Sequence, residues 1–232
     1  PRTIEDHRAN IMKKLGAMVM VAVSAFAAVG SVASDAKACG GEWVPAVEID
    51  HRPEGIARAE KVLKKGEHAA AAAMIIRMMP HVKDLKAKKD GTLVARAQRI
   101  LALAVARNNG ALPIAKELPS YAQGTWIGKS SKDQATNLEW SVAALRKLSD
   151  IKKDDAAVQS DLAEALAKVE KHRGEAKELL EKLAKKDLIS TPEGYATLAD
   201  LRSAAGDSAG QKVAQKRCES MAKSATVCRA SA

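Results

Sequence analysis

Two stretches of the chain decide its fold: LAEALAK at residues 162–168 and YATLADL at residues 195–201. Each contains a leucine followed by a very small residue, Leu162–Ala163 in the first and Leu198–Ala199 in the second. Further apolar residues follow at helical spacing in both stretches. Because small side chains allow two helix axes to approach closely, the region from 155 to 207 predicts tightly packed helices.

The spacing of these pairs is that of a repeat. Leu162 and Leu198 are 36 residues apart, and a Gly206–Asp207 turn begins eight residues after Leu198. The pattern resembles the tetratricopeptide repeat, a pair of helices that recurs about every 34 residues. The chain departs from that family where Ala163 and Ala199 replace the usual glycine, and the turn around residues 172–174 is one residue longer.

The resemblance implies an all-α fold of antiparallel helical hairpins, stacked as a short right-handed solenoid. It implies that Leu162, Ala163, Leu198 and Ala199 pack where the helices of each repeat meet. It also implies that a groove of the solenoid binds a protein or peptide. Such folds host many functions, so the identity of the partner does not follow from the resemblance.

The composition favours helices along the whole chain. Of 232 residues only 14 are glycine and seven proline, and aromatic residues make up 3%, so the core must be built from Ala, Leu, Val, Ile and Met. Apolar periodicity and breakers predict helices over residues 54–65, 68–79, 92–108, 113–118, 133–149, 156–172, 175–186, 193–205 and 209–222. The expected hairpins pair the helices within 54–79, 92–118, 156–186 and 193–222.

A positively charged start followed by an apolar run predicts a secretory signal peptide. Met12–Lys14 precedes an uncharged run over residues 15–30, and small residues follow at 31–33 and 36–38. This run is shorter than the roughly 20 residues of a membrane-spanning helix, although a retained membrane anchor is the alternative. We therefore expect export to the periplasm or cell envelope of a bacterium.

Four segments follow from these patterns. Residues 1–38 form an N-terminal extension with the signal peptide, and residues 39–53 an extended lead-in with prolines. Residues 54–223 form the helical repeat domain, which resembles the tetratricopeptide repeats, and residues 224–232 the C-terminal tail.

Three cysteines remain after signal cleavage: Cys39, Cys218 and Cys228. If the last helix ends near Ala222, the tail can turn back and bring Cys228 to Cys218, so we predict a disulfide between them. The alternative is three free thiols. Cleavage after Ala38 would make Cys39 the first mature residue, where it would be lipidated, free or paired with another chain, and lipidation is the only membrane link expected.

Few aromatic residues are available for recognition. Tyr121 and Trp126 lie in a non-helical stretch, residues 120–131, and Trp140 lies in the following helix. These three residues are the candidate partner-binding loop. In the alternative interpretation Trp126 fills the core.

No recognised constellation for catalysis, cofactor binding or metal binding is present. The sequence lacks metal-ligand spacing among its histidines, a phosphate-binding glycine loop, a nucleophile elbow and a Cys-x-x-Cys pair. We therefore expect no cofactor and a non-enzymatic interaction or scaffold protein. The alternative enzyme is an envelope hydrolase acting on cell-wall glycan, for which Glu139 beside Trp140 is the candidate acid.

The formal net charge of +10 favours acidic partners or anionic envelope polymers. Binding of nucleic acid is not expected, because export, scattered lysines and few aromatic residues argue against it.

Overall fold

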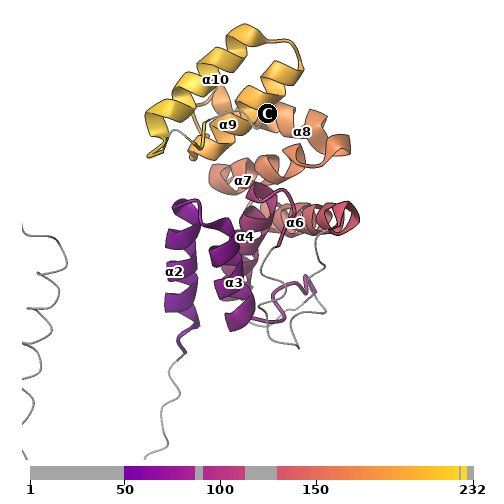
Figure 1. Ribbon diagram of the computed structural model, residues 1–232, viewed down its shortest axis with the longest axis vertical. Coiled ribbons are helices and arrows are strands. Elements are labelled where there is room, and N and C mark those ends of the chain that lie inside the picture. Colours follow the sequence, from indigo (N-terminus) through magenta and orange to yellow (C-terminus); the bar gives the residue numbers. More distant parts are fainter. Residues whose placement is uncertain (1–49, 87–90, 113–129, 225, 229–232) are drawn as a thin grey trace, which may run out of the picture. The chain divides into compact units, whose positions relative to one another are not determined.

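The computed structural model describes residues 50–86, 91–112, 130–224 and 226–228. In that part of the chain the secondary structure is all helical (Figure 1), which confirms the predicted all-α class. The helices are α2 (Arg52–Lys64), α3 (His68–Met78), α4 (Gly91–Arg107), α6 (Ser131–Ile151), α7 (Ala156–Ala167), the short 3₁₀ helix η2 (Glu170–His172), α8 (Arg173–Ala184), α9 (Pro192–Ala204) and α10 (Ser208–Met221). Within these residues, no helix has the length and apolar character needed to cross a lipid bilayer. The expected signal segment, Cys39, Tyr121 and Trp126 lie outside the described residues.

The α-helices pack in the order in which they occur in the chain. Each one contacts its successor, from α2 against α3 to α9 against α10 (Figure 1). A second set of contacts skips one or more elements and joins α2 to α4, α4 to α7, and α7 to α9. Contacts are therefore made mainly between helices that are close neighbours in the sequence.

Among the described helices α4 packs against α6. The hairpin that the sequence predicts within residues 92–118 stays a prediction, because its second helix falls outside the described residues. Two buried side chains of α6 join it to the neighbouring backbone: Asn137 donates from Nδ2 to the Gly110 carbonyl oxygen at 3.0 Å, and Ser141 donates to that of Ala102 at 2.7 Å. Residues 113–129 lie outside the described part.

Local residue choices explain where the helices begin and end. Asp155 caps α7 by accepting from the backbone N–H groups of residues 157 and 158. Thr191 caps α9 and is followed by Pro192, whose missing N–H costs nothing in the first turn. After α4, Asn109 and Gly110 both adopt positive φ, 50° and 78°. At Gly110 a Cβ atom would lie 2.3 Å from the Gln134 carbonyl oxygen, so only glycine fits there.

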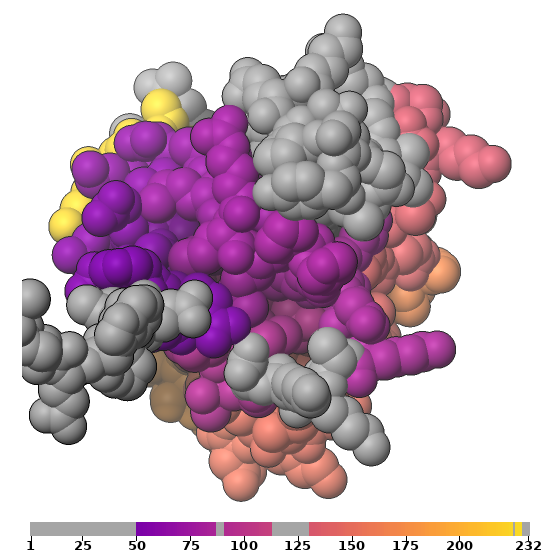
Figure 2. Space-filling view, turned by 90° about the horizontal axis from the view of Figure 1, so that it is seen from below, coloured from indigo at the N-terminus to yellow at the C-terminus, as the bar shows by residue number. Residues whose placement is uncertain are grey.

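Two apolar cores fill the space between the helices, and α4 contributes to both. Leu101 and Val105 pack with α2 and α3, while Ala102 and Ala106 face the core formed with α6 to α10. Figure 2 views the molecule from the side of residues 50–112, whose atoms (indigo to magenta) make up most of the coloured surface seen there. The second core contains Leu162, Ala163, Leu198 and Ala199, all of which are buried.

A close approach joins α7 to the start of α9. Gly194 is buried, and a Cβ atom there would lie 2.8 Å from Ser160 Oγ of α7 and 2.7 Å from Ile189 Cγ2. A larger residue would push the two helices apart. This contact sets the distance between α7 and the start of α9, where the charged side chains described next form their pairs.

Candidate functional site

A set of buried and partly buried polar side chains lies where α4, α7 and α9 meet. Arg107, the last residue of α4, donates two hydrogen bonds to Glu164 of α7, from Nε at 2.9 Å and from Nη2 at 3.2 Å. Its third nitrogen, Nη1, donates to Glu193 of α9 at 2.9 Å. The Thr191 hydroxyl donates to Glu164 Oε1 at 2.8 Å. We call Arg107, Glu164, Glu193 and Thr191 the ion cluster.

A second ion pair joins the same two helices, α4 and α7. Arg99 donates to Asp161 Oδ2, while the other carboxylate oxygen, Oδ1, is buried and has no hydrogen-bond partner among the described residues. Only 1% of the Asp161 side chain is exposed. Burial, together with the nearby charge of Glu164, raises the pKa of Asp161 to about 6, although Arg99 opposes the shift.

The ion cluster can fix the helix register, but nothing in it is arranged for chemistry. Its carboxylates are occupied by Arg107 and Thr191, and the described residues contain no group of three His, Cys, Asp or Glu suited to a metal ion. His68 at the start of α3 lies nearby, and burial, with the charge of Arg107, lowers its pKa. Sliding α7 along α4 would leave buried charges unpaired, which is strongly unfavourable.

A surface hollow of about 580 Å³ lies between the end of α8, α9 and α10. We call it the α8–α10 groove. Its apolar lining residues are Ala184, Tyr195, Leu198, Val213 and Ala214. Its charged lining residues are Lys185, Asp187, Arg202, Lys216 and Arg217. Val213 is an exposed large apolar residue, with 66% of its surface accessible to solvent.

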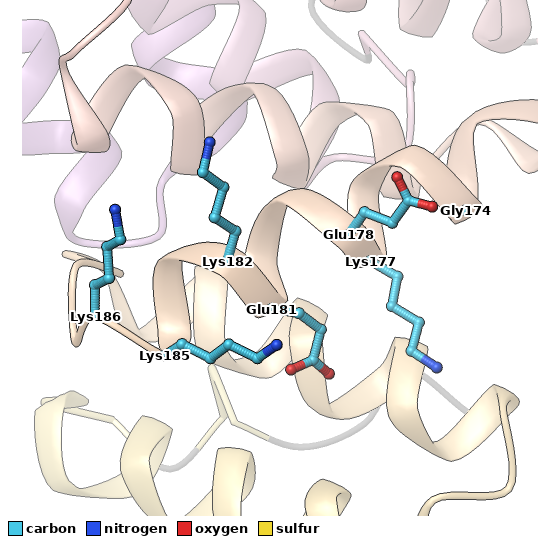
Figure 3. Close-up of a pocket in the computed structure, with 7 residues that line it drawn as sticks. All are labelled: Gly174, Lys177, Glu178, Glu181, Lys182, Lys185 and Lys186. Atoms are coloured by element: carbon cyan, nitrogen blue, oxygen red, sulfur yellow. The ribbon is translucent and has the colours of Figure 1, made fainter.

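A second hollow, of about 610 Å³, runs along α8 and shares Lys185 with the groove. Its side chains form two rows with a spacing of four residues: Lys177, Glu181 and Lys185 in one, and Glu178, Lys182 and Lys186 in the other. Figure 3 shows Lys182 and Lys186 on one side of α8 and Glu181 and Lys177 on the other. We call these six residues the α8 charged face.

Fixed contacts hold the walls of the groove. Arg202 of α9 donates from Nε and Nη2 to Glu181 of α8, at 2.8 and 2.7 Å, and from Nη1 to the Gly210 carbonyl oxygen of α10 at 2.9 Å. The bond from Arg202 lowers the pKa of Glu181, and the charges of nearby lysines lower it further. One arginine therefore connects all three helices.

A second connection crosses the groove between α10 and the turn after α8. Arg217 donates to Asp187 at 2.6 Å, and the Tyr195 hydroxyl donates to the same carboxylate at 2.9 Å. The Arg217 guanidinium also lies 5.9 Å from the centre of the Tyr195 ring. Cys218 and Cys228, the pair favoured by the sequence, lie at disulfide distance, with 2.02 Å between their sulfur atoms. The tail is thereby attached to α10.

The structure places two further sequence candidates. Trp140 packs against both cores, and its indole nitrogen donates to the Lys83 carbonyl oxygen at 2.9 Å. Glu139 has a 45% exposed side chain and pairs with Lys171 at 2.6 Å. An exposed, paired carboxylate lacks the apolar surroundings of a typical catalytic acid.

Sequence reasoning missed Arg107, Glu164 and the Arg99–Asp161 pair, although a signal was present. Asp161 and Glu164 lie in a mainly apolar stretch, residues 158–167, and Arg99 and Arg107 are eight residues apart in a helix with strong apolar periodicity. Charges inside helices that are buried on most sides indicate paired partners. The lysines of α8 were treated as a solvated face, because sequence alone does not place α10 beside them.

No protein-family model matches the chain, and comparisons with curated proteins and with solved structures found no match either.

Proposed function

We propose that this protein is a non-enzymatic scaffold of the bacterial cell envelope that binds another protein or peptide through a short stack of helical hairpins. The hairpins would be α2–α3, α4–α6, α7–α8 and α9–α10, arranged as in tetratricopeptide repeats. Export would follow from the apolar run over residues 15–30, with lipidation of Cys39 as the only link to a membrane.

The observation that carries the proposal is the order of helix contacts. In stacked hairpins each helix contacts its successor, and the first helix of one hairpin contacts the first helix of the next. The contacts of α2 with α4, α4 with α7, and α7 with α9 have this order. The buried pairs Leu162–Ala163 and Leu198–Ala199 lie on α7 and α9, each the first helix of its proposed hairpin.

Binding rather than catalysis is favoured by the surfaces available. The two hollows among the described residues that we characterise are open and contain no histidine. One is lined by charged residues of α8, and the other by apolar and charged residues. Repeat proteins present extended surfaces of this kind to other proteins. The exposed ion pair at Glu139 gives no support to the alternative of a glycan hydrolase.

The test is capture of a partner in the native host. The full-length chain with a C-terminal tag is crosslinked in cells and purified from the envelope fraction, beside an unrelated exported protein with the same tag. We expect an envelope protein to be enriched with this chain only and to bind the purified protein directly. If no protein is enriched while the purified chain degrades cell-wall material, the protein is an enzyme and the proposal fails.

A further inference from the structure

We propose that the α8–α10 groove, together with the adjoining α8 charged face, binds an acidic amphipathic helix of the partner. This inference rests on the proposed function and names the surface and the chemistry of the segment bound. It is carried by a surplus of lysines beside the exposed side chain of Val213.

The charges around the groove are unbalanced. Its two best-placed carboxylates are already engaged, since Glu181 accepts from Arg202 and Asp187 accepts from Arg217 and Tyr195. Among the described residues no ion pair joins a carboxylate to the lysines of this surface: Lys177, Lys182, Lys185, Lys186 and Lys216. The carboxylates of the two hollows, Glu178, Glu181 and Asp187, are outnumbered by their lysines and arginines, so carboxylates brought by a partner would meet a surplus of positive charge.

The spacing of these lysines fits a helix. Lys182 and Lys186 are four residues apart on α8, as are Glu181 and Lys185. A bound helix running beside α8 would present acids at the same interval, because residues four apart lie on one face of both helices. The stretch from Lys177 to Lys186 spans about 14 Å, which corresponds to two to three turns of the bound helix.

An apolar strip runs beside the lysines. Val213 projects from α10 with 66% of its surface exposed, and Ala184, Tyr195 and Leu198 line the same hollow. A helix whose apolar residues recur every three to four positions would cover this strip and place its acids toward Lys185 and Lys216, which line the same hollow. An anionic polymer without apolar groups would use the lysines alone and leave Val213 exposed.

The groove is held in shape before a partner arrives. Arg202 connects α8, α9 and α10, and Arg217 connects α10 to Asp187. The disulfide at Cys218 attaches the tail to the same helix. Such fixed walls reduce the entropy that is lost on binding.

The probe is a synthetic peptide of about four turns with glutamates four residues apart on one face and leucines on the other. It is titrated into the isotopically labelled full-length protein and followed by amide chemical shifts and by fluorescence anisotropy. We expect shifts confined to α8, α9 and α10, with an affinity that weakens with added salt. Absence of shifts in these helices at about 1 mM peptide would overturn the proposal.

Three variants identify the chemistry. The triple variant Lys182→Glu, Lys185→Glu, Lys216→Glu should weaken peptide binding at least tenfold. The matched triple Lys61→Glu, Lys132→Glu, Lys153→Glu changes the net charge equally at exposed sites outside the groove and should change binding less than twofold. Val213→Ser should weaken peptide binding severalfold and leave binding of poly-L-glutamate unchanged. The variants should match the unmodified protein in circular dichroism, because every changed residue is exposed.

The contrary outcomes are distinct. Equal loss in both triple variants would mean that only net charge is sensed. Equal binding of the peptide and poly-L-glutamate, with no effect of Val213→Ser, would make the surface a site for an anionic polymer. If the groove triple variant captures the cellular partner as well as the unmodified chain does, the groove is not the docking site, while the proposed function stands. If the unmodified chain captures no partner, the proposed function itself fails.

Discussion

Arg107 and Glu164 form an ion pair that is almost completely shielded from water, with 9% and 3% of the two side chains exposed and 2.9 Å between nitrogen and oxygen. Arg107 serves Glu193 as well, so one guanidinium balances two carboxylates on two other helices. Because its charges are removed from water, such a buried ion pair costs free energy to form, and removing one of its partners destabilises the fold strongly.

Removal of the cation should therefore be severe. We expect Arg107→Leu to lower the free energy of unfolding by about 3–5 kcal/mol, because Glu164 would remain buried without a counter-charge. The measurement is denaturant unfolding followed by circular dichroism. The double variant Arg107→Leu, Glu164→Leu should recover part of the loss.

A surface pair provides the control for that experiment. Arg146 pairs with Glu175 between α6 and α8, with 42% and 45% of the side chains exposed. Arg146→Ala should change the free energy of unfolding by less than about 1 kcal/mol. Comparable losses for Arg107→Leu and Arg146→Ala would show that burial of the ion cluster has no energetic consequence.

The raised pKa of Asp161 predicts a pH-dependent stability. Its value in the folded chain, about 6, exceeds the ordinary 3.8, so the folded state binds the proton more tightly. Stabilisation by that proton is fully present below about pH 4 and lost as the pH rises through 6. Asp161→Asn lacks this dependence, so its free energy of unfolding relative to the unmodified protein should rise by roughly 1–3 kcal/mol from pH 4 to pH 7.

The control for the pH experiment is a carboxylate whose pKa is shifted in the opposite direction. A hydrogen bond from Arg96 lowers the pKa of Glu60, so stability from this carboxylate is lost as the pH falls. Glu60→Gln should therefore become less stable relative to the unmodified protein as the pH rises. If the stability of Asp161→Asn relative to the unmodified protein is flat with pH, the pKa of Asp161 is the same in the folded and unfolded states and the assignment is wrong.

Truncation of Leu198 tests the packing of α9 against its neighbours. The residue is fully buried, so Leu198→Ala should cost about 2–5 kcal/mol in denaturant unfolding. Val213→Ala, on the exposed side of the same groove, should stay within about 0.5 kcal/mol. A loss below about 0.5 kcal/mol for Leu198→Ala would contradict the packing described here.

The Cys218–Cys228 disulfide should stabilise the last helix. The bond spans ten residues, so Cys228→Ser should lower the free energy of unfolding by very roughly 2–3 kcal/mol. In this variant amide exchange should increase first in α10, the last described helix, whose main packing partner is α9. Peptide mapping of unreduced protein from the native envelope checks the pairing, and free thiols at both positions would refute it.

Export predicts a defined new N-terminus. The apolar run over residues 15–30 and the small residues after it lead us to expect a mature chain that begins between Ser34 and Cys39. Intact-mass analysis of protein from the native host measures this directly. Detection of residues 12–33 on the mature protein would show that the segment is retained.

The helices were predictable because their boundaries are encoded by local chemistry. Thr191 and Pro192 give the start of α9, and Asn109–Gly110 gives the end of α4, so these two limits agree with the expected ones within a few residues. The helix expected over residues 156–172 was too long, because α7 ends at Ala167 and the 3₁₀ helix η2 follows. The two leucine–alanine pairs likewise predicted which side chains of α7 and α9 are buried. These features depend on a few adjacent residues and need no knowledge of the rest of the chain.

The pairing of distant elements was harder to predict. The packing of α4 against α6, which begins 24 residues after Arg107, was not predicted from the sequence. The Arg107–Glu164 bond likewise joins side chains 57 residues apart. Lys185 and Val213 line one groove because α8 and α10 both pack against α9. No local sequence pattern predicts this arrangement.

The acids of α7 also limit how a chain of this kind can lengthen. Tandem duplication of the α7–α8 unit would place a second copy of Asp161 and Glu164 against the first α7. That helix, AAVQSDLAEALA, contains neither arginine nor lysine, so the new acids would be buried without a cation. In consensus repeat arrays a module can be duplicated because all modules are alike. In this chain the acids of α7 require the arginines of α4, Arg99 and Arg107, so the α7–α8 unit cannot be duplicated without a second such helix.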